Sequence, residues 1–176
     1  SLSGEEPFGS EASIEDRINA VKTLPFVIHV SSHPNKSSAL SLTNQLRENG
    51  FDAHWAPVRI SANTHIYRVY VGRFSDWKQA HRFVQILRKK PFGGHATAIP
   101  YPLALQVGET NSLKEARVLL RSLRESGLSG LLLVSYNEPI GTRLRVVVGA
   151  FKNEDNATWM LRKLKQFGFD GKLITP

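Results

Sequence analysis

Hydrophobic residues in the first half of the chain switch between a spacing of two and a spacing of about 3.6, which distinguishes strands from helices. Phe26, Ile28 and Val30 alternate with their neighbours and predict a strand, whereas Ala39, Leu42 and Leu46 share one face of a helix. The pattern continues with strands over 51–60 and 66–72, a helix with the stripe Ala80, Phe83, Val84 and Leu87, and a strand over 95–99. The predicted order is strand, helix, strand, strand, helix, strand.

The second half of the chain repeats the first at a constant offset of 77 residues. Tyr67–Phe74 (YRVYVGRF) returns as Leu144–Phe151 (LRVVVGAF), and Leu46-Arg47-Glu48 returns as Leu123-Arg124-Glu125, with no gap needed. Self-similarity at a fixed period defines the repeating unit of a fold. We therefore predict one module over residues 25–100 and a second over residues 102–176.

The two predicted modules are separated only by Pro100-Tyr101-Pro102. Proline fixes its own backbone and restricts the residue before it. We therefore expect the modules to be held in a fixed relation rather than to swing on a tether.

The predicted fold class is α+β. Two helices in this order of strands imply a ferredoxin-like or RNP-like βαββαβ module, in which both helices cover one face of a four-stranded, mainly antiparallel sheet. The opposite face, called here the front face, is expected to be open. Because side chains alternate along a strand, the neighbours of core residues point to the front face.

The front face is the place where this fold is expected to carry chemistry. In the first module, alternation selects Val27, His29, Ser31, Ile66, Arg68 and Tyr70, with His54 added from the second strand. In the second module it selects Ala104, Gln106, Gly108, Arg143, Arg145 and Val147, with Leu131 from the second strand. The first module is expected to expose hydrogen-bond donors and an aromatic ring, which suit a polar polymer, whereas the second front face is more apolar.

Residues 1–24 are expected to lie outside the modules. The polar segment 1–11 predicts disorder, and Ser13 with Asp16 predicts the start of a short amphipathic helix that places Ile14, Ile18, Val21 and Leu24 together. We expect this helix, or the neighbouring module, to cover the apolar front face of the second module. The start at Ser1 without an initiator Met or a signal sequence is typical of a piece of a larger anchored or secreted protein.

Composition and motifs exclude several kinds of function for this chain. The net charge of +8 favours an anionic partner, and the lack of cysteine excludes thiol chemistry and cysteine-bound zinc. The chain has no phosphate-binding glycine loop, nucleophile elbow or metal-ligand motif, so we expect neither an enzyme nor a metal or cofactor. A nucleic-acid-binding RNP-like module and a pair of small-ligand regulatory domains remain alternatives, although RNA modules usually carry more front-face aromatics.

Each module resembles a SPOR (sporulation-related repeat) domain. The resemblance rests on Tyr67–Phe74, on its counterpart Leu144–Phe151, and on Leu105-Gln106-Val107-Gly108 in an opening strand. It covers residues 25 to 176 and is strengthened by the helical Ala80 and Ala157, each six residues after the last Phe of its motif.

The resemblance implies a non-catalytic protein of the bacterial periplasm and cell envelope that binds peptidoglycan glycan strands without stem peptides at the division septum. Septal envelope proteins are further expected partners, and membrane attachment is expected only through an anchor outside this piece. The family's ligand contacts correspond to His29, Ser32, Ile66 and Arg68 in the first module and to Gln106, Glu109, Arg143 and Arg145 in the second. Ser31 and Tyr70 complete the candidate glycan contacts, with Arg68 as the expected anchor.

Overall fold

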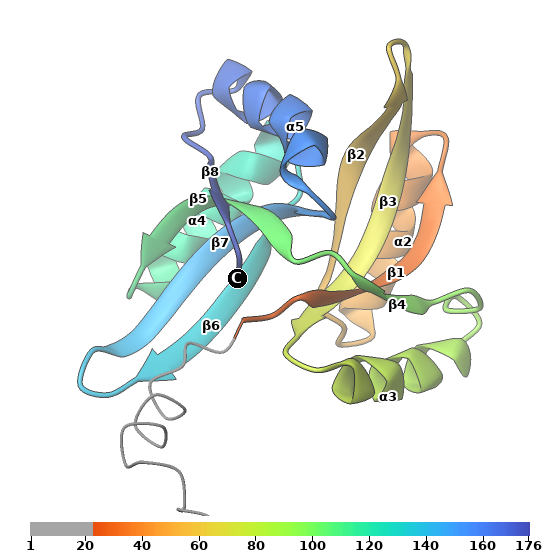
Figure 1. Ribbon diagram of the computed structural model, residues 1–176, viewed down its shortest axis with the longest axis horizontal. Coiled ribbons are helices and arrows are strands. Elements are labelled where there is room, and N and C mark those ends of the chain that lie inside the picture. The colour runs from red at the N-terminus through yellow and green to blue at the C-terminus, as the bar shows by residue number, and fades with distance from the viewer. Residues whose placement is uncertain (1–22) are drawn as a thin grey trace, which may run out of the picture.

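A computed structural model describes residues 23–176 of the chain (Figure 1). The predicted disordered start and nearly all of the predicted amphipathic helix lie outside the described residues. The structure confirms the α+β fold class, because two four-stranded antiparallel sheets each carry two helices. No helix among residues 23–176 is both long enough and apolar enough to cross a membrane.

Module 1 contains the predicted six elements in the predicted order. They are β1 (Phe26–His33), α2 (Lys36–Glu48), β2 (Ala53–Ser61), β3 (Thr64–Phe74), α3 (Trp77–Arg88) and β4 (Thr97–Pro100). The strands lie in the order β2-β3-β1-β4, and every neighbouring pair is antiparallel. This order places β3 and β1 at the centre of the sheet and β2 and β4 at its edges.

Module 2 repeats this topology. Its elements are β5 (Leu103–Thr110), α4 (Leu113–Glu125), β6 (Leu131–Asn137), β7 (Gly141–Phe151), α5 (Glu154–Gln166) and β8 (Lys172–Ile174), in the sheet order β6-β7-β5-β8. The chain passes from β4 directly into β5 across the middle of the molecule (Figure 1).

Each of the helices α2 to α5 begins at a polar side chain that accepts a hydrogen bond from an otherwise unpaired backbone N–H of the first helical turn. The side-chain oxygens of Asn35, Asp76, Ser112 and Asn153 each accept a hydrogen bond from the backbone N–H three residues further on. A polar N-cap of this kind typically stabilises a helix by about 1 kcal/mol.

The helices of each module pack on one face of its sheet and form the main core. Tyr67, Val69 and Val71 of β3 point into the core of module 1, as the alternation predicted. Leu144, Val146 and Val148 of β7 do the same in module 2. Two large apolar clusters of this kind explain why the repeat folds as two modules, each with its own core.

Simple alternation fails within the first strand of each module, because its pairing with the central strand shifts register. One such shift lies between His29 and Ser31 in β1, and another lies at the corresponding place between Gln106 and Gly108 in β5. Residues directly opposite each other in an antiparallel pair share a face. Ser31 lies opposite the core residue Val69, so the expectation that Ser31 is on the front face is wrong.

Gly108 is displaced in the same way. It lies opposite Val146, and a Cβ atom added to it would meet the Leu119 side chain of α4. The front-face assignment of Gly108 is therefore also wrong. An extra residue in one strand turns the following side chains to the other face, and hydrophobic periodicity alone does not reveal it.

Candidate functional site

The inner halves of the two front faces are buried between the modules. Val27, Ala56 and Tyr70 of module 1 pack against Ala150, Ile99 and Tyr101. Ala104, Leu131, Leu133 and Val147 of module 2 pack against Leu24 and Ile174. The expectation that both front faces are open is therefore wrong for their centres. Tyr70 has no exposed surface, so the predicted display of its aromatic ring to solvent is wrong.

The covering residues follow the same 77-residue offset as the sequence repeat. Leu24 covers module 2, and Tyr101, 77 positions later, covers module 1. Ala150 packs on the front face of module 1, and its counterpart Arg73 is buried at the junction of the modules. The two modules therefore contact each other through equivalent surfaces, although the residues at these positions differ.

Arg73 joins the modules through backbone carbonyl groups. Its guanidinium donates hydrogen bonds to the carbonyl oxygens of Leu24 (3.1 Å), Tyr101 (2.8 Å) and Leu103 (2.9 Å). Burial lowers the pKa of Arg73 to about 10, so the group remains charged at neutral pH. A buried charge that donates three hydrogen bonds orders the segments before β1 and β5.

His54 lies beside Arg73 in this buried region. It is fully buried, and neither ring nitrogen has a hydrogen-bond partner among residues 23–176. Its ring centroid is 5.4 Å from that of Tyr70. Burial, and then the charges of Arg73 and Arg47, lower the pKa of His54 to about 3. His54 is therefore a neutral packing residue and offers no donor to a ligand.

The outer part of the module 1 front face keeps a polar cluster at the surface. His29 Nε2 lies 3.0 Å from Ser32 Oγ, and Ser32 lies opposite Arg68 in the sheet. Arg68 is half-buried and donates from Nη1 to the Tyr101 hydroxyl at 3.1 Å. Ile66 is half-buried further along the same strand. The register shift that removes Ser31 from the front face brings Ser32 beside His29.

The electrostatics of this cluster leave one permanent positive charge. Burial, and then the charge of Arg68, lower the pKa of His29 below its ordinary value, so its imidazole is neutral at pH 7. Contacts with Tyr70 and Tyr101 outweigh burial and raise the pKa of Arg68. The cluster therefore combines one guanidinium with neutral groups that both donate and accept hydrogen bonds.

A cavity of about 360 Å³ adjoins Arg68 and is made by both modules. Module 1 contributes Arg59, and module 2 contributes Lys152 and Trp159. The Trp159 ring also lies 4.9 Å from the ring of His65 on β3, measured between centroids. Sequence reasoning missed Trp159, because only the packing of the modules brings α5 to the front face of module 1.

In module 2 the side chains at the corresponding positions also lie close together, but they form hydrogen bonds with one another. Arg143 donates from Nε and Nη2 to the two carboxylate oxygens of Glu109, and Gln106 donates to Glu109 at 3.4 Å. The hydrogen bonds from Arg143 lower the pKa of Glu109. Arg145 is partly buried beside this pair, where burial and then Arg143 lower its pKa. The guanidinium of Arg143 is thus paired with the carboxylate of Glu109.

The part of the chain that the structure describes contains no cluster of side chains arranged to bind a metal ion. Residues 23–176 contain no group of three or more histidine or acidic side chains that could hold a metal ion. The candidate site is therefore described by its hydrogen-bonding groups and its arginine.

Comparison with protein families gives one result. The family model described as SPOR domain matches the chain twice, over residues 22–96 and 100–175. Comparison with curated proteins gives no significant match, and comparison with solved structures gives none either. The two matched ranges coincide with the two folded modules.

Proposed function

Because the chain belongs to the SPOR domain family, which is a family of peptidoglycan-binding rather than catalytic domains, we propose that it binds glycan strands that lack stem peptides. Such strands mark the division septum, so the proposed location is the bacterial periplasm at the septum. Septal envelope proteins are the proposed further partners.

The observation that carries the proposal is the contrast between the two polar clusters. In module 1, Arg68 has no carboxylate partner among the described residues, and its one side-chain bond is to the Tyr101 hydroxyl. In module 2 the counterpart of Arg68 is Arg145, which lies opposite Glu109 in the sheet, and the Glu109 carboxylate is bound by Arg143, so this cluster already contains its own anion. We therefore assign glycan binding to the outer front face of module 1.

The chemistry of the cluster fits a hexosamine strand. Removing a stem peptide exposes the lactyl carboxylate of muramic acid, and an arginine fork holds a carboxylate with two hydrogen bonds. His29 and Ser32 are placed to exchange hydrogen bonds with sugar hydroxyl and acetamido groups. The adjoining cavity with Trp159 offers room and an apolar surface for a neighbouring sugar.

Nucleic acid is disfavoured by the same geometry. RNA-binding modules of this topology stack bases on exposed aromatic rings of the central strands. Tyr70 is fully buried, and its counterpart Val147 is buried as well. RNA is therefore used as a competing ligand in the test below.

The test is retention of the protein on amidase-treated sacculi, on intact sacculi and on immobilised RNA. We expect retention to be strongest on treated sacculi, and Arg68→Ala to weaken it about tenfold or more, since a charged hydrogen bond is worth about 1.5–3 kcal/mol. Arg82→Ala, which removes the same charge from the exposed surface of α3, is the matched control. Equal retention of the two variants, or preference for RNA, would contradict the proposal.

A further inference from the structure

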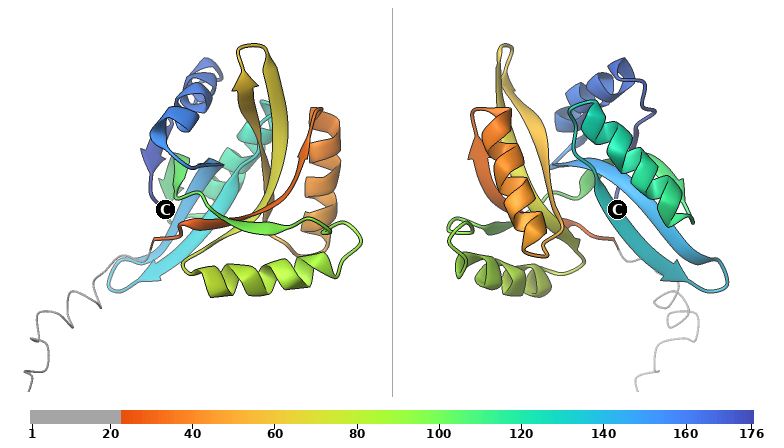
Figure 2. Two further views of the ribbon diagram at one scale, coloured as in Figure 1. Left: turned by 45° about the vertical axis from the view of Figure 1, so that its right-hand side comes forward. Right: turned by 180° about the vertical axis from the view of Figure 1, so that it is seen from behind.

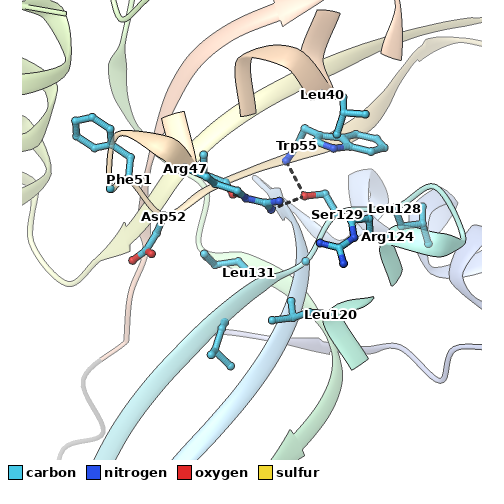
Figure 3. A pocket seen from close by; sticks show the side chains of 14 residues that line it. Leu40, Arg47, Phe51, Asp52, Trp55, Leu120, Arg124, Leu128, Ser129 and Leu131 are labelled. Atoms are coloured by element: carbon cyan, nitrogen blue, oxygen red, sulfur yellow. Dashed lines mark hydrogen bonds between the residues drawn. The ribbon is translucent and has the colours of Figure 1, made fainter. Parts of the chain in front are cut away.

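A second cavity, of about 420 Å³, lies between the modules on the side of the helices (Figure 3). Its walls come from α2 and the start of β2 in module 1 and from α4 and the start of β6 in module 2. The right-hand view of Figure 2 shows α2 and α4 on the same side of the molecule. The front-face cluster of module 1 does not contribute to this cavity.

Two equivalent arginines meet at this cavity. Arg47 of α2 and Arg124 of α4 are related by the 77-residue offset, and both line the cavity. Figure 3 shows their guanidinium groups directed towards the same space beside Ser129. Burial, and then the charge of Arg124, lower the pKa of Arg47, as expected for two neighbouring like charges.

No carboxylate neutralises this arginine pair within residues 23–176, where Arg143 and Glu109 form the one side-chain ion pair. Asp52 also lines the cavity, but its carboxylate extends away from both guanidinium groups in Figure 3. A third cation lies close by, because Lys36 Nζ is 5.4 Å from the centroid of the Trp55 ring that lines the cavity. The cavity therefore has an excess of positive charge.

Ser129 supplies a hydroxyl at the same place. Its oxygen accepts hydrogen bonds from the Trp55 backbone N–H (3.2 Å) and from Arg47 Nη2 (3.3 Å). A hydroxyl that accepts two hydrogen bonds keeps its own hydrogen free to donate. Arg47 is held in position by a further bond from Nε to the Ala53 carbonyl oxygen at 2.8 Å.

We propose that this cavity binds an oxyanion, a carboxylate or phosphate group, between Arg47 and Arg124. The Arg124 guanidinium presents a planar fork that fits two oxygens of such a group, and Arg47 donates from Nη1, since its Nε and Nη2 already bind Ala53 and Ser129. The anion relieves the repulsion between the two arginines and accepts a hydrogen bond from Ser129. Leu40, Leu120 and Leu128 line the same cavity and contact the apolar part of the molecule that carries the anion.

The proposed anion contacts both modules at once. It therefore stabilises their packing in addition to occupying the cavity, because a ligand that binds only the folded assembly raises its stability by mass action. The site is separate from the polar cluster on the front face of module 1, so one chain has a place for a second anionic group.

The test measures binding by calorimetry and the melting temperature of the full chain with two probes, inorganic phosphate and N-acetylmuramic acid. N-acetylglucosamine is the neutral control, and sodium chloride balances the ionic strength. We expect Arg124→Gln to weaken binding of the active probe about tenfold, since it removes a charged pair of hydrogen bonds. Arg162→Gln on the exposed surface of α5 is the matched control and should bind as wild type.

A second measurement separates a binding role from a purely structural one. Without any probe, Arg124→Gln should melt at or above the wild-type temperature, because it removes like-charge repulsion from Arg47. Binding of phosphate alone identifies a phosphate-bearing ligand, and binding of the sugar acid alone identifies a carboxylate-bearing one. The proposal is overturned if neither probe binds, or if wild type and Arg124→Gln bind the probes equally.

The result is independent of the proposed front-face function. Arg68→Ala should leave the difference between wild type and Arg124→Gln unchanged for these probes, because Arg68 lies on the front face. Equal binding of the probes by wild type and Arg124→Gln therefore counts against the cavity alone, whereas unchanged retention of Arg68→Ala on sacculi counts against the front face alone.

Discussion

Replacing His54 with leucine should remove much of the acid sensitivity of this protein. His54 is fully buried, and its ring nitrogens have no hydrogen-bond partner among the described residues. The equivalent position in module 2 is Leu131, which packs in the same place against Val147. The fold therefore accommodates leucine at this position, and the two side chains have similar volumes.

The magnitude follows from the pKa of His54, which burial lowers from 6.5 to about 3. Above pH 6.5 the imidazole is neutral in both the folded and the unfolded chain, so pH has no effect through this group. Between pH 6.5 and 3 the unfolded chain binds a proton that the folded chain does not, so stability falls as the pH falls. At 1.36 kcal/mol for each pKa unit, lowering the pH from 7 to 5 destabilises the protein by about 2 kcal/mol through His54 alone.

The assay is urea unfolding of wild type and His54→Leu at pH 7 and pH 5. With a urea dependence of about 2 kcal/mol per molar, the wild-type midpoint should fall by about 1 M more than that of the variant. At pH 7 the variant should be more stable than wild type by about 1 kcal/mol, because a buried polar group without partners is removed.

The control is His95→Leu, which removes an exposed histidine and should keep the wild-type response to pH. An equal loss of stability between pH 7 and pH 5 in His54→Leu and in wild type would contradict this role of His54. Such a result would mean that the His54 ring is protonated in the folded protein at pH 5.

Two further stability predictions concern the junction between the modules and the end of a strand. Arg73→Met should lower the free energy of unfolding by about 3 kcal/mol, because the carbonyl groups of Leu24, Tyr101 and Leu103 lose a charged donor. Urea unfolding measures this loss, and a value below about 1 kcal/mol would contradict the prediction. Gly149→Ala should cost about 1 kcal/mol more than Gly50→Ala in thermal unfolding. Both glycines have positive φ, but a Cβ at Gly149 would lie 2.5 Å from the Phe151 ring whereas Gly50 has open space, so equal costs would refute the steric argument.

The elements of the fold were predictable because local patterns decide them. Alternation in Tyr67–Val71 and in Leu144–Val148 identified the core side of each central strand correctly. The N-caps at Asp76 and Ser112 were likewise readable from residue types at short spacing. Such signals depend on neighbours within a few residues along the chain, so the sequence displays them directly.

The candidate site was predicted only in part. The resemblance to a family placed His29, Ser32 and Arg68 together, and the structure brings them together on the front face of module 1. Alternation alone selected Ser31 instead, because the register shift in β1 has no signature in the hydrophobic pattern. Tyr70 was assigned to the correct face, but its burial by module 2 depends on residues far away in the sequence.

The residue pattern alone identifies two copies of one βαββαβ module and the strand residues that form each core. Which parts of the two front faces remain accessible depends on how the modules pack on each other. Ala150 and Tyr101 cover the centre of one face, Leu24 covers the other, and Glu109 binds Arg143. A repeat specifies each module through short-range periodicity, whereas the packing of one module on the other depends on shape and charge between residues that lie far apart along the chain.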